Sequence, residues 1–140
     1  MKTLLMFPSF AVLSLIAVAA QAGELAVTIT DIRESQGLLM VSVVNSDAAW
    51  NNQAKPVAAQ KIAAIKGEMT LDFPDLPPGK YAVQVMHDEN GNNKLDANFL
   101  GIPSEGYGFS NNPNVMRRAH FDEAAFEVGA DKTVISIHLR

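Results

Sequence analysis

The stretch FPDLPPGKYAVQVMH, residues 73–87, decides how this sequence folds. Two prolines and a glycine at 77–79 predict a tight turn, because proline fixes φ and glycine adopts backbone angles closed to other residues. The residues after the turn alternate, so that Tyr81, Val83 and Val85 share one face. A period of two predicts a strand with that face buried against a core.

The same alternation recurs along the chain and predicts an all-β fold. With the strand at 80–87 it marks seven strands, the others at 25–32, 38–45, 58–65, 68–73, 124–128 and 132–139. The polar turn at 33–37 ends in a glycine and predicts that the first two strands form a hairpin. Gly67 predicts a second hairpin turn, and the alanines at 57–65 would also permit a helix. Seven short strands separated by turn signals predict a β-sandwich.

The first 22 residues predict an export signal. Lys2 precedes an apolar run, and the sequence Ala20-Gln21-Ala22 places small residues where a signal peptidase cuts. A proline and two serines interrupt the run and no basic cluster follows it, which argues against a membrane anchor. Cleavage before Gly23 would leave one domain, residues 23–140, with no membrane span, in the periplasm or outside the cell.

Composition excludes several classes of protein. The chain has 11 basic and 15 acidic residues, a net charge of −4, and loss of Lys2 with the signal makes this −5. An acidic chain without a basic patch argues against nucleic acid or an anionic membrane as a partner, and we expect an unidentified ligand or protein of the cell envelope. The absence of cysteine excludes thiol catalysis and cysteine-ligated metals.

Three longer motifs resemble known proteins. FPDLPPGKYAVQVMHDENGNNKLD (73–96) resembles the turn and strand of transthyretin-like sandwiches. HDENGNNKLDANFLGIPSEGYGFSNN (87–112) and FDEAAFEV (121–128) resemble the bacterial family called domain of unknown function 2141. The resemblance implies an exported protein without an assigned activity. It also implies a single Greek-key β-sandwich of about seven strands, transthyretin-like (prealbumin-like) or immunoglobulin-like, with one long ordered loop.

Residues 88–96 have the alternating oxygen pattern of a calcium loop. The expected ligands are Asp88, Asn90, Asn92, the carbonyl of Lys94, and Asp96. Phe99 stands where an EF-hand has its bidentate glutamate, so the missing carboxylate would come from the adjacent Glu89 or from Glu105 folding back. Leu95 would anchor the loop to the core. We expect a weak, structural calcium site. The alternative is a turn whose side chains cap only the local backbone.

Residues 105–112, EGYGFSNN, form a second candidate site. Aromatic rings between glycines, followed by amides, are typical of shallow sites for carbohydrates or peptides. The residues of this site would be Glu105, Tyr107, Phe109, Asn111 and Asn112. The alternative is that both rings pack on the sandwich and hold the loop in place.

No catalytic motif is present, because the sequence has neither a G-x-S-x-G elbow nor an H-E-x-x-H helix. We therefore expect a non-enzymatic binding or structural module. A small hydrolase around His87, Asp88 and Asp96 is the alternative, although no nucleophile is indicated.

Overall fold

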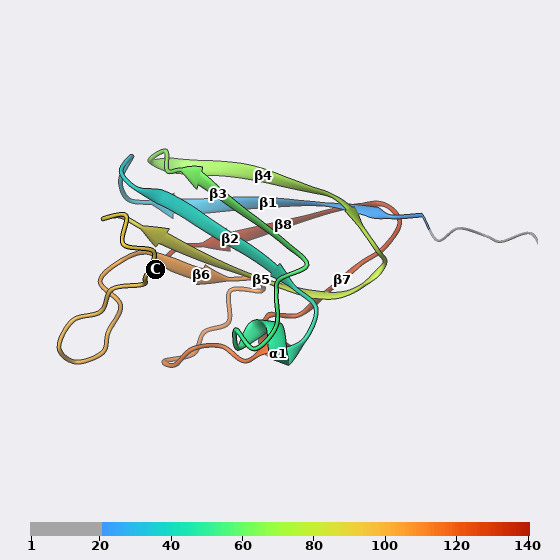
Figure 1. The fold of residues 1–140 in the computed structure, drawn as a ribbon. Coiled ribbons are helices and arrows are strands. Elements are labelled where there is room, and N and C mark those ends of the chain that lie inside the picture. Colours follow the sequence, from blue (N-terminus) through green and yellow to red (C-terminus); the bar gives the residue numbers. More distant parts are fainter. Residues whose placement is uncertain (1–20) are drawn as a thin grey trace, which may run out of the picture.

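The computed structural model describes residues 21–140, so the predicted signal peptide, residues 1–22, lies almost wholly outside it. The described chain forms eight strands and two short helices (Figure 1). They are β1 (Gly23–Ile32), β2 (Leu38–Val44), α1 (Asp47–Trp50), β3 (Ala58–Ala63), β4 (Gly67–Leu76), β5 (Gly79–Asp88), β6 (Tyr107–Phe109), α2 (Phe121–Ala124), β7 (Phe126–Val128) and β8 (Lys132–His138). Neither helix is long and apolar enough to cross a membrane.

The strands build two sheets, as expected for an all-β sandwich (Figure 1). One has three strands in the order β4-β1-β8, with β1 antiparallel to β4 and parallel to β8. The other has five strands, in the order β3-β2-β5-β6, and β7 also pairs with β5. β6 pairs with residues 84–86 of β5 and β7 with residues 79–81, so the two short strands meet different parts of β5.

The main core lies between the sheets and follows the predicted alternation. Leu25, Val27 and Ile29 of β1 are fully buried, and they share one apolar cluster with Val83 and Val85 of β5. A smaller cluster contains Trp50, Ala82 and Phe121. Because Ala82 points away from the main core, the two helices cover the other face of β5 at this end.

Both predicted hairpins are wrong. β1 pairs with β4 and β8, whereas β2 pairs with β3 and β5, so the turn at 33–37 carries the chain from one sheet to the other. β3 and β4 likewise lie in different sheets. Gly37 shows why this crossing needs glycine. Its φ is +72°, and a Cβ there would lie 2.0 Å from the carbonyl oxygen of Asp88. Residues 58–63 form a strand, as favoured over a helix.

The turn before β5 is fixed by its tyrosine. The Tyr81 hydroxyl donates a hydrogen bond to the carbonyl of Pro77 at 2.6 Å, and the side chain is 3 % exposed. Burial raises the pKa of Tyr81, so the hydroxyl remains a donor throughout the neutral range. The bond fastens the proline–glycine turn to the first residues of β5, as in the tyrosine corners of other sandwiches.

Tyr81→Phe therefore removes one buried hydrogen bond while keeping the ring. We expect it to lower the free energy of unfolding by about 1 kcal/mol, measured by urea denaturation. Tyr107→Phe is the matched control and should change little, because Tyr107 is only partly buried. Equal stability of the two variants would show that the Tyr81–Pro77 bond contributes nothing.

Candidate binding groove and its supporting loop

The chain leaves β5 at a buried carboxylate. Asp88 is fully buried, and its Oδ1 accepts hydrogen bonds from the backbone N–H groups of Gly91 (3.0 Å) and Asn92 (3.1 Å). Its Oδ2 accepts one from the N–H of Asn93 at 2.8 Å. Gly91 and Asn93 have positive φ, 75° and 61°, which curls these amides around the carboxylate. A charged acceptor with three backbone donors is a strong local constraint.

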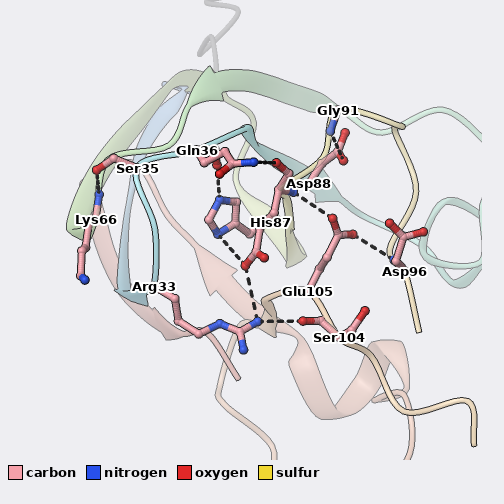
Figure 2. Close-up of polar contacts among 11 residues, drawn as sticks. Arg33, Ser35, Gln36, Lys66, His87, Asp88, Gly91, Asp96, Ser104 and Glu105 are labelled. Carbon is pink, nitrogen blue, oxygen red and sulfur yellow. Dashed lines mark hydrogen bonds and ion pairs between the residues drawn. The ribbon is translucent and has the colours of Figure 1, made fainter. Parts of the chain in front are cut away.

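Glu105 closes the same loop from its far end (Figure 2). It is 5 % exposed, and its two carboxylate oxygens accept hydrogen bonds from the N–H groups of Glu89 and Asp96, each at 2.9 Å. The glutamate therefore folds back onto the loop, where its oxygens hold backbone amides. Two buried carboxylates thus hold residues 88–105, which have few ladder hydrogen bonds of their own.

The remaining polar side chains of the loop contact one another. Asn92 Nδ2 donates to both carboxylate oxygens of Asp96 at 2.9 Å, and Asn90 Nδ2 donates to the same carboxylate. The amide oxygens of Asn90 and Asn92 accept hydrogen bonds from backbone N–H groups two residues ahead. Within residues 21–140, no group of three or more His, Asp or Glu residues is arranged to hold a metal ion. The loop as described is capped by its own side chains.

His87 is also part of this support. It is fully buried, and its Nε2 lies 2.7 Å from the carbonyl of Gln36, which can only accept, so Nε2 carries the hydrogen. Its Nδ1 lies 3.7 Å from a carboxylate oxygen of Glu89, and Arg33 lies 3.5 Å from that oxygen (Figure 2). His87 and Asp88 do not line the groove described next, so this geometry gives no support to the hydrolase alternative.

A groove of about 620 Å³ lies over the outer face of the five-stranded sheet. Its size is in the range of small-ligand sites. Outward side chains of three strands form the floor: Met40, Ser42, Gln84, Met86, Tyr107 and Phe109. The loop after β5 provides one wall, including Lys94, Leu95 and Pro103, and residues 116–118 provide the other. The loop that Asp88 and Glu105 hold is therefore a side of the groove.

The second wall is held by two arginines. Arg118 donates to the carbonyl of Trp50 and to Gln84 Oε1 (2.9 Å), and its guanidinium lies 5.4 Å from the centre of the Trp50 ring. Arg117 makes two 2.8 Å bonds to Glu123. These bonds, with the backbone N–H of His120, lower the pKa of Glu123 from its usual value near 4.5 to about 2. The wall is thus tied to both helices.

The groove is locally basic, although the chain has a net charge of −4. Its lining contains Lys94, Arg117 and Arg118, and it contains neither Asp nor Glu. Glu123 offsets the charge of Arg117 from behind the wall. The ammonium group of Lys94, another lining residue, forms no salt bridge within the described part of the chain. The groove can therefore receive an anion beside apolar surface.

Of the residues predicted for the second site, Tyr107 and Phe109 line the groove floor. Their ring centres are 5.8 Å apart, and Phe109 lies 5.4 Å from Trp50. The other members of that site hold backbone elsewhere. Asn111 donates to the carbonyls of residues 123 and 125, and Asn112 bonds both Ser136 and His138 on β8. Their amides are therefore already engaged.

One expectation about the apolar side chains of the loop is wrong. Leu95 does not anchor the loop to the core, because it is 37 % exposed and lines the groove. Phe99 is 96 % exposed. Sequence reasoning also missed Met40, Met86 and Met116 in the lining. The outward positions of β2 and β5 carry two of these methionines, and this alternation was the available signal.

Comparison with protein families bears on the whole domain. A family model described as "Uncharacterized protein conserved in bacteria (DUF2141)" matches residues 27–136. The chain belongs to this family. The resemblance read from the motifs at 87–112 and 121–128 is confirmed, and the DUF2141 region includes the loop, the groove and nearly all of both sheets. Searches of curated proteins and of solved structures gave no significant match.

Replacing Asp88 should destabilise the whole domain. Asn at this position keeps the shape but replaces one acceptor oxygen by an NH₂ group, which would face the backbone donors. We expect Asp88→Asn to lower the free energy of unfolding by about 3 kcal/mol. Asp131→Asn, at an exposed turn, should stay within about 0.5 kcal/mol of the native protein. A small effect of Asp88→Asn in urea denaturation would contradict the role assigned to this carboxylate.

Proposed function

We propose that this DUF2141 protein is an exported, non-enzymatic binding module whose ligand lies in the groove over β2, β5 and β6. The observation that carries the proposal is the lining, where apolar side chains lie beside cations without any acidic group. A structural role alone does not account for three methionines and two aromatic rings around an open groove of about 620 Å³. Apolar grooves of this size with a few polar groups are typical ligand sites.

The proposed ligand has an apolar body and an anionic group. Met40, Met86 and Met116 are flexible and polarisable, so they adapt to apolar ligands of varied shape. Lys94 supplies a charge for the anionic end. A carbohydrate fits less well, because the amides of Asn111 and Asn112, which would bind its hydroxyl groups, already hold backbone. An amphipathic anion of the cell envelope is therefore the better candidate.

The proposal also includes the location of the protein in the cell and the topology of its strands. We propose removal of residues 1–22, one domain at 23–140, and a periplasmic or extracellular site. Supporting this, β1 begins at Gly23, directly after the expected cut, and Gly23 is packed so closely that a Cβ would lie 2.0 Å from the Gly129 carbonyl.

We also propose a Greek-key, transthyretin-like topology. The parallel pairing of β1 with β8 supports it, as do the crossings of the chain between the sheets from β1 to β2, from β3 to β4 and from β4 to β5.

The groove can be tested with 8-anilinonaphthalene sulfonate, a fluorescent apolar anion. We expect it to bind at one site and to quench Trp50, the single tryptophan, which lies against Phe109 and Arg118. Tyr107→Ala and Lys94→Ala should each weaken binding by roughly fivefold to tenfold. Val134→Ala, an apolar truncation on β8 outside the groove lining, should not. No binding of the probe, or equal affinity for it in all variants, would contradict the proposal.

We also propose a second, structural ligand, a weakly bound calcium ion at residues 88–96. Supporting this, the side chains of Asn90 and Asn92 both reach the carboxylate of Asp96. Rotation of the two amides would direct their oxygens to the place where their NH₂ groups now lie, with the Lys94 carbonyl and Asp88 completing the ligand set. The rotation breaks the bonds that these oxygens accept from backbone N–H groups, so affinity should be low, with a dissociation constant on the order of 1 mM.

A melting experiment tests the calcium proposal. With about 10 mM calcium, a site of this affinity stabilises the folded state by about 1.4 kcal/mol, which raises the Tm of chelator-treated protein by roughly 5 °C. Asp96→Asn should abolish the rise, and Asp131→Asn should retain it. Magnesium should have little effect, because it requires stricter octahedral geometry. An unchanged melting curve would leave only the self-capped turn.

A further inference from the structure

The loop after β5 ends in an exposed apolar tip at residues 99–102. Phe99, Leu100 and Ile102 are exposed over 96, 68 and 57 % of their surfaces. None of them contributes to either apolar core cluster. Three large apolar side chains together in water are costly, and such patches mark interaction sites.

The backbone under this tip is well ordered. The side-chain oxygen of Asn98 accepts hydrogen bonds from the N–H groups of Leu100 (2.9 Å) and Ile102 (3.1 Å). Asn98 and Ile102 also bond through their backbones at 2.9 Å, and Ala97 bridges to Pro103 below them. A turn held by its own hydrogen bonds thus carries the three side chains, so their exposure follows from the ordered conformation of the loop.

A second apolar point lies on the opposite wall of the groove. Met116 is fully exposed and lines the groove across from Gly101 and Pro103. Figure 1 shows that the loop between β5 and β6 and the segment before α2 both extend away from the sheets to the same side. The groove therefore has two apolar rims, with Lys94 on one wall and Arg117 on the other.

We propose that these two rims dock on a lipid surface, with the groove facing the membrane. Phe99, Leu100 and Met116 would enter the boundary between headgroups and acyl chains, and Lys94 would lie near the phosphates. The inference rests on the proposed function, since it makes the groove's amphipathic anion a lipid of that surface. Nothing in it requires the chain to span the membrane.

The shape of the tip favours lipid over a second copy of the chain. A protruding tip needs a concave partner in a protein, and the concavity at hand is the groove itself. The groove lining contains Lys94, Arg117 and Arg118 without an acidic residue, and the tip of a second copy, residues 97–103, has no acidic side chain to meet these cations. The phosphates of a lipid surface complement the cations, while its acyl boundary receives the apolar rims.

The three apolar side chains Phe99, Leu100 and Met116 give weak, reversible attachment. A single myristoyl chain reaches an association constant of about 10⁴ M⁻¹, and the rims bury less apolar surface, so we expect about 10³ M⁻¹. The net acidity of the protein limits the help from anionic lipid, and salt should therefore change binding only slightly. Binding of this strength is measurable at millimolar lipid.

The test is flotation of the exported protein with vesicles of phosphatidylcholine and phosphatidylglycerol. Mass spectrometry first confirms that residues 1–22 are absent, because that apolar segment would insert by itself. At roughly 1 mM accessible lipid about half of the protein should float. Phe99→Asp combined with Leu100→Asp should reduce the association constant at least tenfold. Val134→Asp, on β8 outside the groove lining, is the matched control and should float like the native protein.

Three results would overturn the inference: no flotation of the native protein, flotation that survives the Phe99 and Leu100 substitutions, or sedimentation velocity without lipid showing a dimer that those substitutions dissociate. The last would assign the tip to a second copy. Binding of 8-anilinonaphthalene sulfonate separates this inference from the proposed function. The Phe99 and Leu100 variant should still bind the probe, so failed flotation with retained probe binding rejects the membrane alone.

Discussion

Three backbone N–H groups converge on the buried carboxylate of Asp88, and the course of the following 17 residues depends on that convergence. An irregular segment of this length has no ladder to hold it, so its backbone donors need acceptors from side chains. Asp88 supplies them at the near end and Glu105 at the far end. The loop so fixed carries Lys94 and the apolar tip, and thereby forms one wall of the groove.

β5 connects the stability of the sandwich to its binding face. Its inward residues, Tyr81, Val83 and Val85, belong to the main core, while Gln84 and Met86 point outward to the groove floor. This strand was predictable from sequence, because alternation reports directly on which residues are buried. Glu89 or Glu105 was expected to supply a missing calcium ligand; Glu105 folds back onto the loop, but its oxygens hold backbone amides. The alternation of the strand uses information that is local to one segment.

What could not be predicted depends on contacts between distant segments. The turn at 33–37 suits a hairpin, yet the residues that pair with β1 lie at least 35 positions away, and periodicity does not encode the partner of a strand. Asn111 and Asn112 have the chemistry of ligand-binding amides, but the fold places backbone carbonyls of other elements within their reach. The groove could not be predicted for the same reason, because its two walls are about 20 residues apart in sequence.

The central claim is that carboxylates of the chain itself, without a ligand, hold residues 88–105 in place. Hydrogen exchange followed by NMR in chelator-treated protein tests this directly, because each amide reports its own bond. The account predicts slow exchange of the N–H groups of Gly91, Asn92, Asn93 and Asp96 in the absence of calcium. Exchange of these four amides at the rate of an unfolded chain, with protection appearing only on addition of calcium, would contradict it.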